Sequence, residues 1–252
     1  MDCGQWAIIE KPLVTDADQL AAILAAMDRH PGKLFVCFQR RYSALTELAR
    51  RDLDLGDGEP VSYHCIVHEP LLPAGHWYRW PNSKSRIVTN ACHWIDHFLY
   101  LNGWAEAHRT SVQTASDSTI ACFAELVNGA CFTMSISYAG SERVGVQDYV
   151  ELHAKGMTVR IVNQSHYSAE SNDRVVRTAR INKISTYRSM YRRIGEQILA
   201  GGPGDCRQSV VSSCGLMLQL DAELAEIMGP RDVLEQTHAD RNLIPIHRGA
   251  RM

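Results

Sequence analysis

Short apolar runs alternate with amphipathic stretches over the first fifty residues. Residues 6–9 and 34–38 are almost wholly apolar, which indicates strands buried on both faces. Between them, Thr15 and Asp16 offer N-caps for a helix whose apolar side chains recur at helical spacing. A second helix is expected at 43–51. This strand–helix–strand–helix order predicts a parallel α/β unit at the start of the chain.

After Gly56-Asp57-Gly58 the apolar positions follow a period of two instead. Helices are expected at 88–101, 186–200 and 206–228. Strands are expected at 61–68, 108–115, 119–127, 130–138, 147–154, 157–163 and 173–181. Asn128-Gly129 is a signal for a two-residue hairpin turn. Consecutive strands joined by short turns predict an α+β domain with a largely antiparallel open sheet packed on helices.

Composition narrows the protein class. The 252 residues are 45% hydrophobic and 21% charged, which suits a packed core, and the net charge of -2 supplies no overall basic field for nucleic acid or an anionic membrane. The eight cysteines form no C-x-x-C pair and several lie in apolar runs, so we expect a reducing, cytoplasmic setting without disulfides. No apolar run reaches the ~20 residues of a membrane span, and no signal peptide is visible.

Two histidines, His93 and His97, lie one helical turn apart with Asp96 beside them. Three interpretations stay open. The pair could bind zinc, since H-x-x-D-H is similar to the inverted zinc-peptidase pattern. It could instead be one packed and one exposed histidine, or His93 could act as a general base. The acidic residue is Asp rather than Glu and no third ligand is evident, so we expect no metal.

A lysine follows the first expected strand directly, in Glu10-Lys11-Pro12. The carboxyl end of a parallel strand is where α/β sheets place their ligands, and an ammonium there could stabilise an alkoxide. The alternative is a surface lysine. The loop 75–81 combines aromatic side chains with His76 and Arg79, which suits a sugar or simply fixes the loop to the protein. Gly56-Asp57-Gly58 lacks the third glycine of a dinucleotide fingerprint, and a surface turn is the better interpretation.

Taken in order, these features resemble the glucose–fructose oxidoreductase / inositol dehydrogenase family (Gfo/Idh/MocA) from about residue 5 to 228. The resemblance rests on 10–13, 34–42, the loop with Trp77, the segment 93–96 and the turn 128–130. It implies a Rossmann domain with G-x-G-x-x-G, followed by an α+β domain for substrate binding and subunit pairing. We therefore expect 1–42 to be the end of a Rossmann-like domain, 43–228 the α+β domain and 229–252 a polar tail.

The resemblance also assigns roles to single residues. It implies that Lys11 and His93 are the catalytic pair. We expect five substrate-binding residues: Arg40, Trp77, Arg86, Asn90 and His97. Glu10, Lys11 and Pro12 are expected to contact the cofactor. The family often has an aspartate four residues before the histidine, where this chain has Thr89 followed by Asn90. Neither ionises, so a proton relay through a carboxylate is not expected.

The activity that follows is an NAD- or NADP-dependent oxidoreductase acting on a CH–OH group of a sugar or polyol. The chain begins where the family's Rossmann domain is almost complete, so we expect the isolated chain to be inactive and the dinucleotide pocket to come from a separate Rossmann-bearing chain or an upstream segment. The alternative is a cofactor-free remnant serving as a binding or assembly module for a full-length relative. In either case we expect a homo-oligomer paired through the sheet face.

Overall fold

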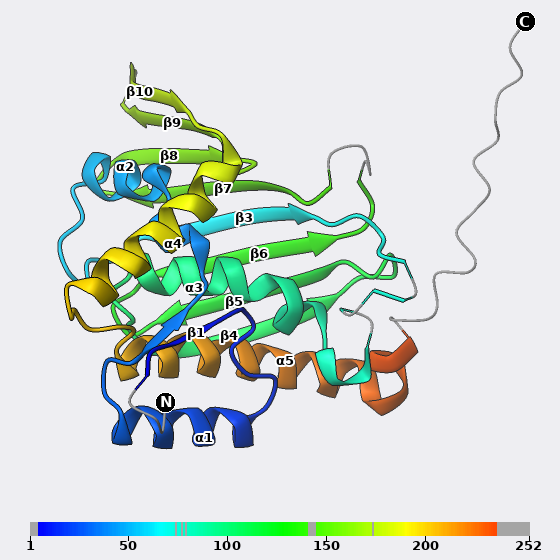
Figure 1. Cartoon of the computed structure of the whole chain (residues 1–252). Coiled ribbons are helices and arrows are strands. Elements are labelled where there is room, and N and C mark those ends of the chain that lie inside the picture. Colours follow the sequence, from blue (N-terminus) through cyan, green and yellow to red (C-terminus); the bar gives the residue numbers. More distant parts are fainter. Residues whose placement is uncertain are drawn as a thin grey trace, which may run out of the picture.

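A small parallel sheet and a large mixed sheet form the framework of the protein (Figure 1). The computed structural model describes residues 5–73, 75–76, 78, 80–140, 145–172 and 174–235. The strands are β1 (Ala7–Ile9), β2 (Leu34–Val36), β3 (Ser62–His68), β4 (Ala107–Thr114), β5 (Ile120–Leu126), β6 (Cys131–Ser137), β7 (Gln147–Ala154), β8 (Met157–Val162), β9 (His166–Ser171) and β10 (Arg174–Arg180). The helices are α1 (Ala17–Arg29), α2 (Ala44–Asp52), α3 (Cys92–Leu101), α4 (Lys183–Leu199) and α5 (Arg207–Glu235), with short turns η1 (Gln39–Tyr42), η3 (Pro81–Ser83) and the π-helical η4 (Ile87–Ala91).

The small sheet pairs β1 with β2 in parallel, and α1 connects the two strands. Asp16 caps α1 by accepting a hydrogen bond from the backbone N–H of Gln19, as the sequence predicts. After β1 the backbone N–H of Cys37 donates to the carbonyl of Ile9 at 2.9 Å, which extends the pairing to the carboxyl ends of both strands. The segment carrying Lys11 leaves the sheet at this point.

The large sheet has eight strands in the order β10-β9-β8-β7-β3-β6-β5-β4. Its neighbours are antiparallel except for the central pair β3 and β6, which is parallel. Two meanders, β4–β6 and β7–β10, therefore meet only through β3. Short turns connect the strands of each meander, including the Asn128-Gly129 turn that the sequence predicts.

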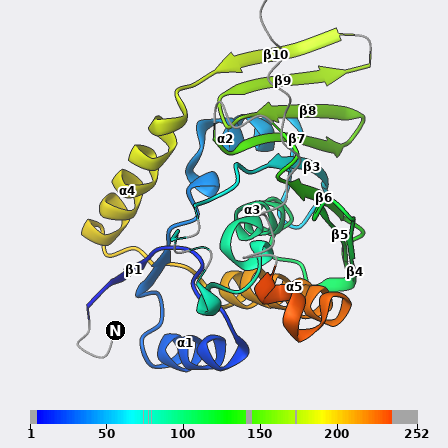
Figure 2. The ribbon, with the colours of Figure 1, turned by 90° about the vertical axis from the view of Figure 1, so that its right-hand side faces the viewer.

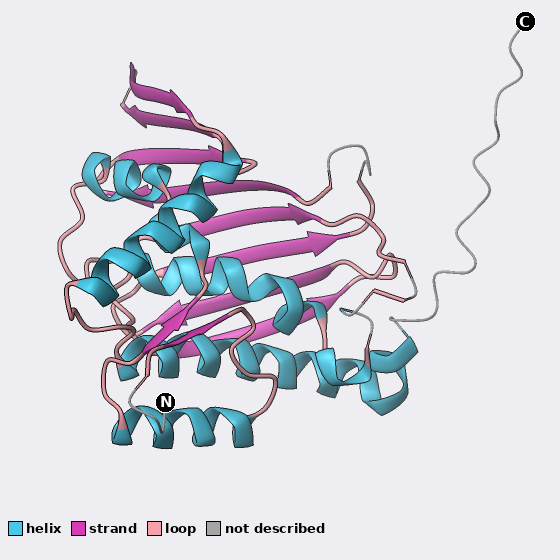
Figure 3. Cartoon of the chain, in the orientation of Figure 1, coloured by secondary structure: helices cyan, strands magenta, loops and turns pink. Residues whose placement is uncertain are grey.

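The described helices lie over one face of this sheet (Figure 3), and none of them covers the other face (Figure 2). Along β3 the side chains of Tyr63, Cys65 and Val67 are buried beneath the helices, whereas Ile66 between them is 62% exposed on the open face. Tyr63 packs against Phe98 of α3 and Phe132 of β6, with ring centroids 6.1 and 5.7 Å apart. This aromatic cluster fixes α3 to the centre of the sheet.

The predicted fold class is confirmed: an α/β start is followed by an α+β region with a mostly antiparallel sheet packed on helices. Strand β9 is absent from the sequence prediction, because its buried side chains, Tyr167 and Ala169, alternate with polar residues too weakly to reveal the period. Helix α5 breaks at Gly229, where φ is 70° and ψ is 165°, and then continues to Glu235. The rest of the expected polar tail lies outside the described residues, and the domain boundary at residue 42 stays a prediction.

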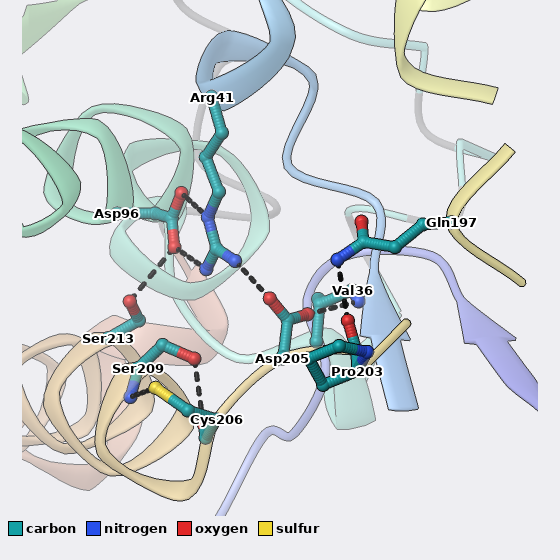
Figure 4. A network of polar contacts seen from close by, with 9 residues as sticks. All are labelled: Val36, Arg41, Asp96, Gln197, Pro203, Asp205, Cys206, Ser209 and Ser213. Atoms are coloured by element: carbon teal, nitrogen blue, oxygen red, sulfur yellow. Dashed lines mark hydrogen bonds and ion pairs between the residues drawn. The ribbon is translucent and has the colours of Figure 1, made fainter. Parts of the chain in front are cut away.

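A buried ion-pair network joins β2, η1, α3 and the start of α5 (Figure 4). The Arg41 guanidinium lies between two carboxylates, bonding Asp96 of α3 through Nε at 2.9 Å and Asp205 through Nη1 at 2.6 Å. Asp205 also accepts from the backbone N–H of Val36 at 2.6 Å, and Asp96 accepts from Ser213 at 2.9 Å. The network therefore fixes α3 relative to the strand β2, and with it the turn that carries His93.

Candidate active site

Lys11 lies at the carboxyl end of β1, two residues after the strand ends. Its ammonium donates to the carbonyl of Thr89 at 2.8 Å and to the Tyr78 hydroxyl at 2.5 Å, and it lies 4.9 Å from the centroid of the Tyr78 ring. Thr89 belongs to the π-helical turn η4 that leads into α3. Such turns are rare and occur frequently at functional sites. The surface-lysine alternative does not describe this side chain, which is partly buried and bonded across the fold.

His93 lies in the first turn of α3, four residues after Thr89, so the structure brings together the two predicted catalytic residues. Its Nδ1 is buried and has no hydrogen-bond partner among the described residues. Burial holds the pKa of the His93 imidazole well below its ordinary value, and the positive charges of Lys11, Arg40 and Lys183 lower this pKa further. At neutral pH the ring is therefore an uncharged base beside an ammonium group.

Arg40 is buried behind His93 and is already engaged by the protein. Its Nη2 donates to Asp148 at 2.6 Å, and its guanidinium lies 4.5 Å from the centroid of the Trp94 ring. The Trp94 indole N–H donates to the same Asp148 carboxylate at 3.0 Å. Arg40 was expected to bind substrate. The structure places it where its positive charge lowers the pKa of His93, with Nη2 held by Asp148 and Nε buried without a hydrogen-bond partner among the described residues.

Arg86 and Asn90 meet at a buried carboxylate that the sequence did not reveal. Glu69 accepts from Arg86 Nε at 2.6 Å and also from the Asn90 side-chain amide. The Arg86 guanidinium carbon lies 3.7 Å from the centroid of the Tyr138 ring, and Nη1 donates to the carbonyl of Ser118 at 2.9 Å. One further Arg86 nitrogen, Nη2, is buried without a hydrogen-bond partner among the described residues. The cluster orients η4 and with it the carbonyl that holds Lys11.

His97 is 1% exposed and its two ring nitrogens are both engaged. The Thr46 hydroxyl donates to the carbonyl of Arg40 at 2.7 Å and lies 3.0 Å from His97 Nε2, so it accepts from the imidazole N–H. The Tyr63 hydroxyl lies 3.1 Å from Nδ1 and donates to it. A substrate therefore has no free nitrogen of His97 to bind, and this histidine is the packed one of the pair.

The remaining predicted residues have different positions. Trp77 lies outside the described residues. Glu10 is exposed and accepts from the Tyr191 hydroxyl at 2.8 Å, and Pro12 is partly buried beside Lys11. Within the described part of the chain, no three His, Cys, Asp or Glu side chains are grouped so that they could hold a metal ion. None of the described helices has the length and apolarity needed to cross a membrane.

Three residues of the site were not assigned a role from the sequence. Tyr78 lies in the aromatic loop that suggested sugar binding, so a local signal for it exists. Glu69 and Asp148 carry no local signal, because their partners are 17 to 108 residues away along the chain. Together the site offers an uncharged base, an ammonium group and fixed positive charge. This combination suits removal of a proton from a hydroxyl group and stabilisation of the resulting negative charge.

No family model matches the chain. The inositol 2-dehydrogenase of Rhodococcus erythropolis is 36% identical over 77 residues, which are 30% of this chain and 22% of that enzyme's length. The sequence similarity is thus confined to a short segment of that enzyme.

Solved structures share the fold over most of the chain. A levoglucosan dehydrogenase in complex with NADH and L-sorbose has a TM-score of 0.72 at 16% identity, covering 89% of this chain and 72% of that protein. A Gfo/Idh/MocA family oxidoreductase from Vibrio cholerae has a TM-score of 0.69 at 12% identity, and the match covers 90% of this chain and 72% of that protein. The chain therefore shares its fold with solved dehydrogenases, among them a Gfo/Idh/MocA family oxidoreductase, and over 77 residues its sequence is similar to that of an inositol 2-dehydrogenase.

Proposed function

We propose that this chain carries the substrate-binding and proton-transfer residues of an NAD(P)-dependent oxidoreductase acting on a CH–OH group of a sugar or polyol. One observation carries the proposal: the Lys11 ammonium is bonded to the Thr89 carbonyl one helical turn before His93. This bond holds Lys11 near His93, although the two are 82 positions apart in the sequence. His93 is a base with a lowered pKa, and the positive charge of Lys11 contributes to lowering it.

The chemistry assigned to these residues is limited to the proton and to charge. His93 accepts the hydroxyl proton of the carbinol, because its imidazole is uncharged at neutral pH. Lys11 donates a hydrogen bond to the carbinol oxygen and stabilises the alkoxide. Bound NAD(P) would take up the hydride from the same carbon. Arg40 and Asp148 behind the site are positioning residues.

The described residues fit one end of such a cofactor. Lys11 and Pro12 at the end of β1 lie beside the substrate site, where a nicotinamide ring would have to lie. Residues 10–16, which connect β1 to α1, contain no glycine, so this strand-to-helix connection supplies no close backbone cradle for a pyrophosphate. We propose that a separate chain or a further segment supplies that cradle. The choice between NAD and NADP belongs to the same part of the site.

Sugar binding tests the proposal without requiring turnover. A panel of polyols and sugars is titrated by calorimetry or saturation-transfer NMR into the wild type and into the variants His93→Ala and Lys11→Met. His108→Gln, which changes an exposed histidine, is the control. We expect the first two variants to lower affinity two- to tenfold, the usual loss for one hydrogen bond, and the control to bind as the wild type does. Sugar affinity that is unaffected by His93→Ala would contradict the proposal.

Turnover separates the enzyme from its alternative. NAD(P)H formation is followed with the bound sugars, with and without an added Rossmann-bearing relative. If turnover is observed, Lys11→Met and His93→Ala should each reduce kcat by roughly 10²–10⁴, the range for a positioned acid–base group. Specific sugar binding without turnover in either setting would instead favour the cofactor-free binding module.

We also propose that two copies of the chain pair through the open face of the large sheet. A hollow of about 470 Å³ lies on this face, lined by side chains of β3 to β7. Ile66 is 62% exposed and Tyr149 37% exposed there, large apolar side chains that a second sheet would cover. A two-fold arrangement presents the same surface from both copies, so one patch suffices for both sides of the contact.

A further inference from the structure

Lys183 is a partly buried lysine at the first position of α4, directly after the N-cap Asn182. It makes no hydrogen bond or ion pair within the described residues, in contrast to Arg40 and Arg41 nearby, which are both paired with buried carboxylates. Helix α4 packs against η1, the turn that contains these two arginines. The ammonium group at this junction is therefore partly removed from solvent and is not neutralised by a bonded partner among the described residues.

The charge of Lys183 acts on the candidate active site. Together with Lys11 and Arg40 it lowers the pKa of His93, so the charged groups that bear on this imidazole are all cations. The acidic group that bears on Lys183 is Asp148, and this carboxylate already accepts from Arg40 at 2.6 Å and from the Trp94 indole at 3.0 Å. The site consequently carries positive charge beyond what binding an uncharged sugar would need.

Three further polar atoms at the α4–η1 junction are buried without a hydrogen-bond partner among the described residues. They are Oγ1 of Thr186, one helical turn after Lys183 on the same face of α4, and Oε1 of Gln39 and Nε of Arg40 in η1. The three residues are 2–4% exposed. Buried polar atoms without partners are uncommon in folded proteins and need an explanation, such as an absent ligand or water. They occur here on the two elements that flank Lys183.

We propose that Lys183 binds an anionic group on the substrate of the His93 site, so that the protein acts on an acidic sugar or polyol, one that carries a carboxylate or phosphate. The inference rests on the proposed function, since it names the substrate class of the same site. Lys183 is then a specificity-determining residue: it contacts the anionic group while Lys11 and His93 act on the carbinol.

The electrostatics of Lys183 agree with such a role. Burial lowers the pKa of its ammonium group, Asp148 acts in the opposite direction, and Arg40 lowers it again. A bound anion would compensate for this unfavourable environment. If Lys183 instead had a purely structural role, removing it would cost stability. Because the ammonium has no bonded partner, Lys183→Met should leave the melting temperature unchanged or raise it.

The test is a comparison of matched acidic and neutral ligands by calorimetry at low ionic strength. D-gluconate and D-glucitol share a carbon skeleton and differ at one end in carboxylate against hydroxymethyl, and D-glucitol 6-phosphate supplies the phosphate. D-glucuronate with D-glucose forms a second pair. We expect the wild type to bind at least one anionic ligand about 10- to 100-fold more tightly than its neutral partner, the range for a charged hydrogen bond. Lys183→Met should abolish that preference and leave the affinity for the neutral ligand unchanged.

Lys155→Met provides the matched control, because it removes the same charge from an exposed lysine on another part of the surface. This variant should keep the preference for the acid. If wild type and Lys183→Met bind the acidic and neutral ligands equally, the inference is wrong while the His93 site stands. If neither the wild type nor His93→Ala binds any of the sugars, the proposed function is wrong and the inference with it. A lowered melting temperature for Lys183→Met with an unchanged preference would show a structural lysine.

Discussion

Acid should destabilise this protein in part through His97, which, like His93, the fold keeps uncharged. Burial holds the pKa of its imidazole well below the ordinary 6.5, and Arg40 lowers it further. Both nitrogens are already engaged, Nε2 as donor to Thr46 and Nδ1 as acceptor from Tyr63. In the unfolded chain the same ring takes up a proton as the pH falls through 6.5. The unfolded state then binds more protons, so the free energy of unfolding decreases as the pH falls.

The magnitude follows from one proton. Each group that is protonated only in the unfolded state changes the free energy of unfolding by about 1.4 kcal/mol per pH unit. Between pH 6.5 and pH 5 the contribution of His97 is therefore about 2 kcal/mol, a large part of the stability of a typical domain. Asp96 acts in the opposite sense, because burial raises the pKa of its carboxyl group despite Arg41. A comparison with a His97 variant removes the contribution of Asp96, which is common to both proteins.

Urea denaturation at pH 7.5 and pH 5 measures the effect. His97→Gln keeps a polar side chain of similar reach but cannot take up the proton, and His108→Gln removes an exposed histidine as control. We expect the wild type and the control to lose about 2 kcal/mol more than His97→Gln between the two pH values. An equal loss in all three proteins would show that His97 does not remain uncharged in the folded state, and the reasoning would be wrong.

Three further outcomes are expected. Arg41→Met should lower the free energy of unfolding by about 3–5 kcal/mol, because Asp96 and Asp205 lose their shared counter-ion; an urea midpoint equal to that of the wild type would contradict the buried network. If two copies pair through the sheet as proposed, Ile66→Glu should convert the dimer to a monomer in light scattering, because the new charge would be buried in the contact, and a monomeric wild type would exclude such pairing. Asn90→Ala should cost about 1–3 kcal/mol of stability by removing a donor from a buried carboxylate, measured by the same denaturation.

The sequence predicts the architecture well because its signals are local. A capping aspartate before α1 and an Asn-Gly turn before β6 each mark an element by the chemistry of two or three neighbouring residues. The π-helical turn 87–91 leaves no such mark, since its residues read as the start of an ordinary helix. For β9, weak alternation concealed a strand whose pairing with β8 and β10 decides its conformation.

The candidate site divides in the same way. Lys11 and His93 belong to motifs that resemble a known family, and the fold brings them together. The partner that a charged side chain chooses is not encoded nearby. The sequence predicts that Arg40 binds substrate, because its partner Asp148 lies 108 residues later in the chain and only the structure shows the bond between them. Lys183 lies in what the sequence suggests is a connection before the last helices, and only the start of α4 three residues earlier than expected places it on a helix packed against η1.

The parallel pairing of β3 with β6 has a consequence for how the chain folds. Each meander can form from strands that are close in sequence, but the sheet becomes continuous only when β3 enters between β6 and β7. During synthesis β3 leaves the ribosome roughly 80 residues before β7 is complete, a delay of about 4–16 s at usual rates of elongation. One edge of β3 stays open until β6 has been synthesised and the other until β7 is complete, and such non-local pairing is slow to form. We therefore expect the docking of β3 between β6 and β7 to be the rate-limiting step of folding. We also expect that two copies can exchange β3 by domain swapping, with the connection 69–86 as the hinge.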